Sequence, residues 1–379
     1  MKPILSATLS VSGLTLTDDE KYMLEQSNPI GVTIFKRNIA SFEQVSALTR
    51  SIKEVIGRDD VIIAVDQEGG KTSRFDPPLV NAFLPQYSIG MLPPFERMEA
   101  TSLHAHLNSD ILIRAGVNLN YAPCLDVRYP VTDGVLRNRC FSTDKKIVSE
   151  CGRVLIETYK SRGIIPCMKH LPGHGRVVAD PHLDLPVVTD SFEDMRIDWY
   201  PFQSNAHVCP MGMTAHILLP EIDEKWPITQ SKIGIDRLIR GEIGFDGFLI
   251  SDGIEMHALK GSLRENTLQA LDAGCDAVCF CKGTSEGMAE VIGACRPLSD
   301  KSLERLARCT AILQQSGRSP VNAAERYTAI QERALISRDD YDAVEVLNMM
   351  NDLDKIKENK RKVQEYALSC LGQTSNSNG

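Results

Sequence analysis

Short apolar runs recur along the chain, and a longer segment with apolar residues at every third or fourth position follows each run. The runs are rich in β-branched residues, which is typical of buried strands. They are "PILSATLSV", "IGVTIF", "VIIAVD", "GVNLNYAP", "GIIPCMKH", "PMGMTAHI", "FDGFLISD" and "DAVCFC". Because nearly continuous apolar strands are buried on both faces, this alternation predicts eight parallel strands with helices between them.

The intervening segments have the spacing of amphipathic helices. Leu103, Leu107 and Ile111, for example, share one helical face and precede Gly116. Eight strands alternating with helices from residue 3 to residue 281 predict an α/β fold of the (β/α)8 TIM-barrel type. A doubly wound open sheet is the alternative.

The pattern changes near residue 318, where charged helical sequence replaces the strand and helix alternation. We therefore expect one catalytic barrel domain over residues 1–317 and a C-terminal helical extension over residues 318–371. The last residues, 372–379, read "GQTSNSNG" and are expected to be disordered. The spacing of Val344, Leu347, Met350 and Leu353 predicts a buried helical face but names no partner, so the oligomeric state stays open.

Charge and composition exclude several classes of partner. The net charge is −8 and no long basic run occurs, which argues against binding to nucleic acid. No apolar stretch is long enough to span a membrane, and the first residues lack the features of a signal peptide. The eleven cysteines, several inside apolar runs, indicate reduced and buried thiols. We expect a cytoplasmic protein with no membrane partner.

Ionisable residues gather where the predicted strands end. In a (β/α)8 barrel these carboxyl ends meet at one face, which carries the active site. The residues are Asp66, Asp126, Lys169, His170, His216 and Asp252. The sequence therefore predicts a polar site at the mouth of the barrel.

The heptapeptide "KHLPGHG", residues 169–175, suggests a metal or phosphate site at first sight. However, Pro172 and Gly173 break any helix that would place His170 and His174 on one face, and no zinc motif is present. The sequence contains neither of the glycine-rich motifs that bind phosphate groups, G-x-x-x-x-G-K-[ST] and G-x-G-x-x-G. The sequence thus predicts no metal and no cofactor, and favours a small polar ligand such as a sugar.

Two groups have the chemistry that glycoside hydrolysis requires. Asp252 ends an apolar strand and precedes Gly253, where the chain can turn and leave the carboxylate in the mouth, so it is a candidate nucleophile. Asp180 and His182 flank Pro181, and a carboxylate beside an imidazole fixes its tautomer and raises its pKa. They are candidates for proton transfer.

Taken together, these stretches resemble family 3 glycoside hydrolases, specifically the bacterial β-N-acetylglucosaminidases that trim peptidoglycan fragments in the cytoplasm. The matching stretches are "GVTIFKRNI", "VDQEGGKTSRF", "NLNYAPCLDV", "RNRCFSTD", "KHLPGHG" with "DPHLDLP", "MTAHILLPEID", "FDGFLISDGIEMHAL" and "AGCDAVCFC". They occur in order over most of the predicted barrel.

The resemblance implies a role for each matching residue. Asp252 corresponds to a nucleophile that forms a covalent glycosyl-enzyme intermediate, and Asp180 with His182 to an acid/base dyad on the loop after a strand. The positions that correspond to sugar-binding residues are Asp66, Arg74, Arg139, Lys169 and His170. The chain departs from the family pattern at Lys71, Leu171, Pro181 and Gly253.

Structural roles are the alternatives for several of these residues. Arg139 could instead form an ion pair with Asp126 at the barrel mouth. His174 is expected to order its loop, and His216 to bond to the backbone in the mouth. We expect His104 and His106 on a helix surface, and Glu68 bonded to backbone in the Gly69–Gly70 turn.

The function predicted is a retaining, exo-acting β-N-acetylglucosaminidase. Its expected substrate is a small carbohydrate, a peptidoglycan fragment with terminal β-linked N-acetylglucosamine. Three alternatives remain: a phosphorylase with the same nucleophile, substrate-assisted chemistry with Asp223 and Glu224, and a sugar-binding barrel without catalytic activity.

Overall fold

Eight parallel strands close into a barrel in the computed structural model, which describes residues 2–130, 132, 134, 136–177 and 185–336. Each strand pairs with the next along the chain, and β8 closes the barrel on β1 through Ala7 with Val278 and Thr8 with Cys279. The strands are β1 (Leu5–Leu9), β2 (Pro29–Ile34), β3 (Ile62–Val65), β4 (Leu119–Asn120), β5 (Ile165–Leu171), β6 (Met211–Thr214), β7 (Phe248–Gly253) and β8 (Ala277–Cys279). The predicted (β/α)8 barrel is confirmed, and closure rules out the open sheet.

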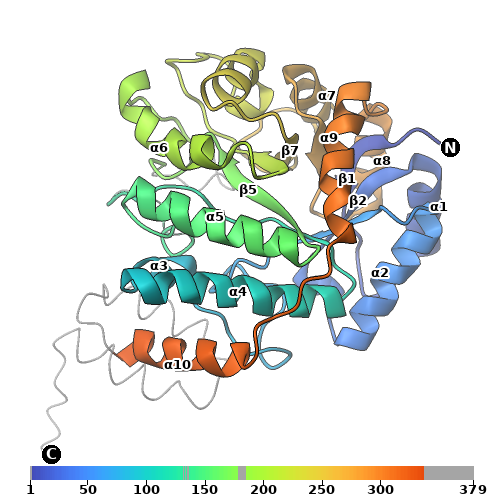
Figure 1. The fold of residues 1–379 in the computed structure, drawn as a ribbon. Helices are drawn as coiled ribbons and strands as arrows, with labels where there is room; N and C mark the ends of the chain where they lie inside the picture. The colour runs from blue at the N-terminus through green and yellow to red at the C-terminus, as the bar shows by residue number, and fades with distance from the viewer. Residues whose placement is uncertain (1, 131, 133, 135, 178–184, 337–379) are drawn as a thin grey trace, which may run out of the picture.

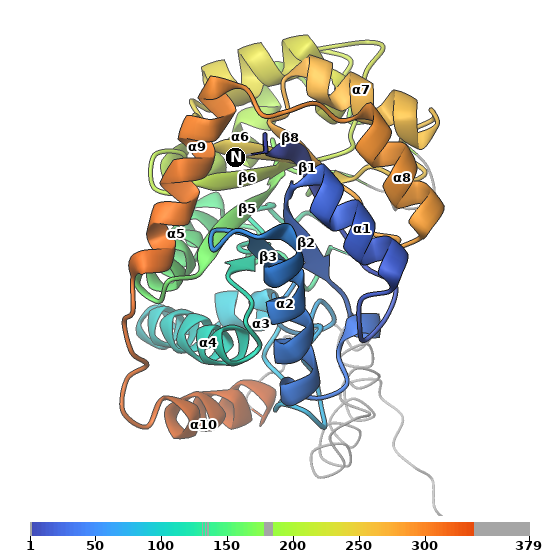
Figure 2. The same ribbon diagram turned by 90° about the vertical axis from the view of Figure 1, so that its right-hand side faces the viewer.

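Helices surround the barrel and connect successive strands, as Figures 1 and 2 show. The α-helices are α1 (Asp18–Ser27), α2 (Phe42–Ile56), α3 (Gln86–Gly90), α4 (Pro94–Arg114), α5 (Lys145–Ser161), α6 (Phe192–Asn205), α7 (Leu263–Ala273), α8 (Ser285–Ala294), α9 (Asp300–Thr310) and α10 (Ala323–Ile336). Among the described residues, the short 3-10 helices are η1 (Lys36–Asn38), η2 (Ile228–Gln230) and η4 (Ala311–Gln314), and a π-helix, η3 (Gly234–Glu242), lies between β6 and β7.

Local sequence signals fix where the helices begin and end. Helix α2 begins after Ser41, whose hydroxyl accepts the backbone N–H of Gln44, and ends at Gly57, which adopts a φ of 77°. Helix α1 begins with a capping box between Thr17 and Glu20. These caps satisfy backbone groups that have no partner inside the helix.

Alternate residues of each strand serve two different cores. Ile63 and Val65 of β3 point outward and pack in the cluster shared with the surrounding helices. Ile62 and Ala64 point inward and pack with the inward residues of the other strands. Successive strand side chains point to opposite faces, so this two-residue period determines which residue reaches the barrel mouth.

The described part of the region after residue 317 is helical. Helix α10 packs along the outer side of α4 and buries Ala323, Tyr327 and Ile330. The remainder of the predicted extension and the tail at 372–379 lie outside the described residues, and the boundary at residue 317 stays a proposal. No helix of the described residues is both long and apolar enough to cross a membrane.

Candidate active site

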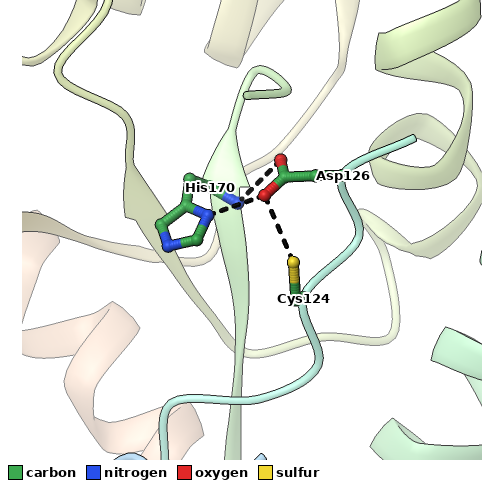
Figure 3. Close-up of side chains that lie close together, drawn as sticks. All are labelled: Cys124, Asp126 and His170. Atoms are coloured by element: carbon green, nitrogen blue, oxygen red, sulfur yellow. Dashed lines mark hydrogen bonds and ion pairs between the residues drawn. The ribbon is translucent and has the colours of Figure 1, made fainter. Parts of the chain in front are cut away.

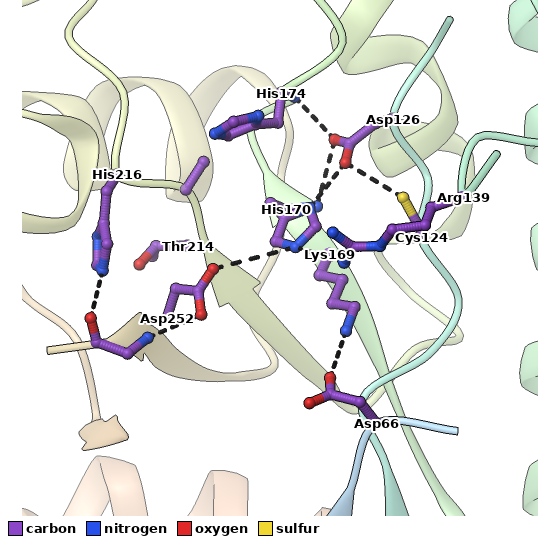
Figure 4. A network of polar contacts seen from close by, with 12 residues as sticks. Asp66, Cys124, Asp126, Arg139, Lys169, His170, His174, Thr214, His216 and Asp252 are labelled. Carbon is purple, nitrogen blue, oxygen red and sulfur yellow. Dashed lines mark hydrogen bonds and ion pairs between the residues drawn. The ribbon is translucent and has the colours of Figure 1, made fainter. Parts of the chain in front are cut away.

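Three inward-facing side chains form the top layer of the barrel. Counting in twos from Ile62 and Ala64 leads to Asp66, just beyond β3. The same count leads from Ile165 and Cys167 to Lys169 in β5, and from Phe248 and Ile250 to Asp252 in β7. The strand period therefore brings three residues from separate strands to one mouth, as Figure 4 shows.

Asp66 is held between two cations. Its Oδ1 accepts from Lys169 Nζ at 2.7 Å, and its Oδ2 accepts from Arg74 Nη2 at 2.9 Å. Burial alone would raise the pKa of Asp66, but the charges of Lys169 and Arg74 hold it well below its usual range. The carboxylate stays ionised and keeps lone pairs for a sugar hydroxyl.

Glu68 is a second, deeper carboxylate of this network. Arg139 donates to it from Nε at 2.9 Å and from Nη2 at 2.8 Å, and Lys169 Nζ lies 2.6 Å from its Oε1. The alternative role of Arg139, an ion pair with Asp126, is not found, because the guanidinium group binds Glu68 instead. Glu68 was expected to bond to backbone in the Gly69–Gly70 turn, and its ion pairs with these two residues, which are distant in sequence, were not predicted.

Lys169 is almost fully buried, with 2% of its side chain exposed. Burial disfavours its charge, yet Asp66 and Glu68 raise its pKa above the ordinary range. The ammonium is therefore permanent at neutral pH. The predicted placement of Asp66, Arg74, Arg139, Lys169 and His170 in one site agrees with the geometry, whereas their sugar-binding roles remain proposals.

His170 is oriented by Asp126, as Figure 3 shows. The imidazole Nδ1 donates to Asp126 Oδ2 at 2.7 Å, so Nε2 faces the mouth, 3.2 Å from Arg139 Nη2 and 4.0 Å from Asp252 Oδ2. Cys124 donates its thiol proton to the same Asp126 oxygen at 3.2 Å. The peptide bonds from Lys169 to His170 and from Leu171 to Pro172 are cis.

Cys124, Asp126 and His170 are also the group whose donor atoms lie close enough together to hold a metal ion, among the residues that the structure describes. All three side chains are buried, and their donor atoms are already bonded to one another. Burial would raise the pKa of Asp126, but its contacts with His170 and His174 lower it, as an orienting carboxylate requires. The arrangement fits a hydrogen-bonded support for His170 better than a metal site.

The other two histidines at the mouth have supporting positions. His174 donates its backbone N–H to Asp126 Oδ1 at 2.7 Å, which agrees with the expected role in loop order. Burial, and then His170, lower the pKa of His174 to about 4. His216 bonds through Nε2 to the carbonyl of Gly253 at 2.9 Å and through Nδ1 to Thr229 Oγ1 at 2.7 Å, so the predicted backbone bond is confirmed.

Asp252 lies between His216 and His170 in Figure 4, with 28% of its side chain exposed. Its Oδ1 accepts the backbone N–H of Gly253 at 2.7 Å. Burial would raise the pKa of Asp252, but His170, His216 and the Gly253 N–H together lower it. The result is an ionised and accessible carboxylate.

The predicted proton-transfer pair, Asp180 and His182, lies outside the described residues. The expectation for another histidine is wrong: His104 in α4 is buried, with 1% exposed, whereas His106 is partly exposed. In the predicted helix His104 directly follows Leu103 and therefore lies at the edge of the apolar face. Nothing in the local sequence indicated its hydrogen-bond partners, which are distant in the chain.

Comparisons with known proteins agree with this geometry. The family model described as the N-terminal domain of glycosyl hydrolase family 3 matches residues 6–309. A β-hexosaminidase of Bordetella avium is 31% identical over 85% of this chain and 90% of that protein. A β-hexosaminidase of Bordetella pertussis is 33% identical over 74% of this chain and 82% of that protein.

A solved structure has a similar fold. NagZ from Neisseria gonorrhoeae, in complex with N-trifluoroacetyl-D-glucosamine, superposes with a TM-score of 0.77 at 25% identity. The match covers 88% of this chain and 98% of that one. With the barrel, the polar mouth and a family match over most of its length, this chain belongs to glycoside hydrolase family 3.

Proposed function

We propose that this glycoside hydrolase is a β-N-acetylhexosaminidase that removes terminal β-linked N-acetylglucosamine with retention of configuration. The observation that carries the proposal is the state of Asp252. It is ionised, accessible and set among hydrogen-bond donors at the carboxyl end of β7. An ionised carboxylate at that position can attack the anomeric carbon of a bound sugar.

The proposed mechanism has two steps. Asp252 forms a covalent glycosyl-enzyme while His182, held by Asp180, protonates the leaving oxygen. Neutral His182 then takes a proton from water, which hydrolyses the intermediate and releases Asp252. Asp66, Arg74, Arg139, Lys169 and His170 would hold the sugar, with the Asp66 carboxylate as an acceptor and the side-chain nitrogens of the other residues beside it.

The proposed natural substrate is a peptidoglycan fragment in the cytoplasm, a muropeptide that carries N-acetylglucosamine at its non-reducing end. The similarity of the motif set to bacterial enzymes of that class supports this choice. Asp223, which forms the substrate-assisted alternative together with Glu224, accepts from the backbone N–H groups of Lys225 and Trp226 and from the hydroxyl of Ser231. Its carboxylate is therefore occupied by hydrogen bonds that stabilise its own loop.

Turnover of 4-nitrophenyl N-acetyl-β-glucosaminide, compared with the matching β-glucoside, tests the activity. We expect turnover of the first substrate, and a loss of at least about 10³-fold in kcat/KM for Asp252→Ala. A slow fluorosugar should label Asp252 in the unchanged chain. Asp223→Asn is the matched control and should retain activity.

Three outcomes would contradict the proposal. Labelling of another carboxylate would overturn the assignment of Asp252. Formation of sugar 1-phosphate when phosphate is added would identify a phosphorylase. Tight sugar binding without turnover of either substrate would indicate a binding module.

A further inference from the structure

Helix α10 lies beyond the segment that the family model matches, which ends at residue 309. One of its side chains, Tyr327, is buried with 3% exposed and points into the body of the protein. Its hydroxyl oxygen lies 2.9 Å from His104 Nδ1 in α4 and accepts the backbone N–H of Leu84 at 3.1 Å. The C-terminal helix is therefore bonded to groups far from it in sequence.

His104 continues this connection toward the active site. Its Nε2 lies 2.9 Å from the carbonyl oxygen of Glu68. A carbonyl oxygen can only accept, so Nε2 carries the proton and Nδ1 must accept from Tyr327. Burial lowers the pKa of His104 to about 4, which keeps the imidazole neutral and the direction of both bonds fixed.

The turn that follows Glu68 rests directly on this histidine. Gly69 has a φ of 104°, and a Cβ added there would lie 2.5 Å from the carbonyl oxygen of Leu84 and 2.7 Å from His104 Cε1. Only glycine permits so close an approach. Phe83 completes the contact, with its ring 5.2 Å from His104 and 5.7 Å from Tyr327.

The loop held in this way begins at Asp66, whose carboxylate faces the proposed sugar site. Glu68 lies between Asp66 and Arg74 in the chain, and its own carboxylate binds Lys169 and Arg139. A shift of the Glu68 backbone would therefore move Asp66 and disturb both cations. Helix α10 is connected to the sugar site by two side chains and one carbonyl group.

We propose that Tyr327 and His104 are positioning residues that hold the loop from Asp66 to Arg74 in its sugar-binding conformation, so that the helix after the barrel sets substrate affinity. This inference rests on the proposed function. Loosening the loop lowers the fraction of molecules competent to bind, which raises KM and leaves kcat nearly unchanged once substrate has ordered the loop.

Tyr327→Phe in the full chain tests the proposal, because it removes only the hydroxyl group. With 4-nitrophenyl N-acetyl-β-glucosaminide we expect KM to rise about five-fold, the effect of losing one buried hydrogen bond, at similar kcat. Amide hydrogen exchange at Leu84 should become faster. His104→Asn should raise KM as well, and the double variant should exceed the larger single effect only slightly, because both residues act through one connection.

Two controls separate positioning from general loss of stability. Tyr121→Phe removes another buried hydroxyl, which lies 3.0 Å from Thr33 Oγ1 inside the barrel, and Arg326→Ala removes a surface ion pair between α10 and Glu99. Both should keep the KM of the unchanged chain. An unchanged KM and unchanged Leu84 exchange in Tyr327→Phe, or an equal KM rise in Tyr121→Phe, would overturn the proposal.

The two proposals fail separately. If the unchanged chain turns over no N-acetylglucosaminide, the proposed function is wrong, and the exchange rate of Leu84 still tests the connection from α10. If the unchanged chain is active and Tyr327→Phe matches it in KM and in exchange, only the positioning role is wrong.

Discussion

At the scale of single residues, the site depends on a buried carboxylate that has no predicted catalytic role. Glu68 has 1% of its side chain exposed and pairs with two cations, the buried Lys169 and the largely buried Arg139. Buried ion pairs contribute little net stability over an apolar replacement, but removing one partner leaves a charge without compensation. The unpaired charge then destabilises the folded state strongly.

We therefore expect Glu68→Gln to lower the free energy of unfolding by about 3 kcal/mol, measured by urea denaturation. Asp236→Asn, which breaks the exposed pair with Lys232, should change it by less than about 0.5 kcal/mol. Equal effects of the two substitutions would show that Glu68 does not stabilise the buried cluster.

The buried imidazole of His104 predicts a dependence of stability on pH. Its folded pKa is about 4, whereas an unfolded histidine titrates near ~6.5. Between these values the unfolded chain binds a proton that the folded chain does not, so stability is fully present above the unfolded pKa and falls as pH falls toward 4. One such proton changes the free energy of unfolding by up to about 1.4 kcal/mol per pH unit.

Urea titrations at several pH values from 7 down to 4.5 measure this effect. The slope of the unfolding free energy against pH should be smaller in His104→Gln than in the unchanged chain, by up to the contribution of one bound proton. Carboxylates contribute to the slope of both chains, so the difference between the chains is the informative quantity. Identical slopes would contradict the neutral state of His104.

The candidate site was predictable where its residues end a strand. Asp66, Lys169 and Asp252 continue the inward two-residue count of their strands, and that period is readable from the sequence. Glu68 and His104 were misjudged because their partners, Arg139, Lys169 and Tyr327, lie far away in the chain, and no local pattern encodes such contacts. The proton-transfer pair stays a prediction.

At the scale of elements, the eight strands were predictable because each is a continuous apolar run. Their bounds were not: β4 is only Leu119–Asn120, although its apolar run is longer. After Asn120 the regular pairing is interrupted, because Ala122 donates to the carbonyl of Asn120, and a bridge between Cys124 and Lys169 then resumes the contact with β5. The π-helix Gly234–Glu242 was not predicted either, because its sequence resembles that of an ordinary amphipathic helix.

Strand packing leads to a prediction at Gly31 in β2. A Cβ at this position would lie 1.9 Å from the carbonyl oxygen of Ile62 in β3, which backbone pairing holds in place. Gly31→Ala should therefore separate the two strands and lower the free energy of unfolding by about 3 kcal/mol or more. Gly13→Ala is the matched control, with no heavy atom within 4 Å of the added Cβ. Urea denaturation should show a large difference between them.

At the scale of the whole molecule, the question is whether the barrel is complete without α10. Ala323, Tyr327, Ile330 and Ala334 are buried, mainly against α4 and the segment before α3. Removing this helix exposes the apolar surface that it covers. The hydrophobic cluster thus continues past residue 317, where the domain boundary stays a proposal.

A chain that ends at residue 317 should be less stable to urea by on the order of 4 kcal/mol, from the apolar area exposed. A chain that ends at residue 336 keeps α10 and separates its contribution from that of the residues after it. Equal stability of the chains ending at 317 and 336 would show that the barrel core is complete without α10.

The ion pairs at the mouth also determine what happens to charge during a reaction. Arg74, Arg139 and Lys169 carry three positive charges, and Asp66 and Glu68 neutralise two of them. Asp252 adds a further carboxylate beside these cations while it is ionised. Once Asp252 is esterified by a sugar in the proposed intermediate, the cations lose one negative neighbour in a poorly solvated space. That loss favours return of the carboxylate, so the mouth is electrostatically prepared for release of the sugar as well as for attack.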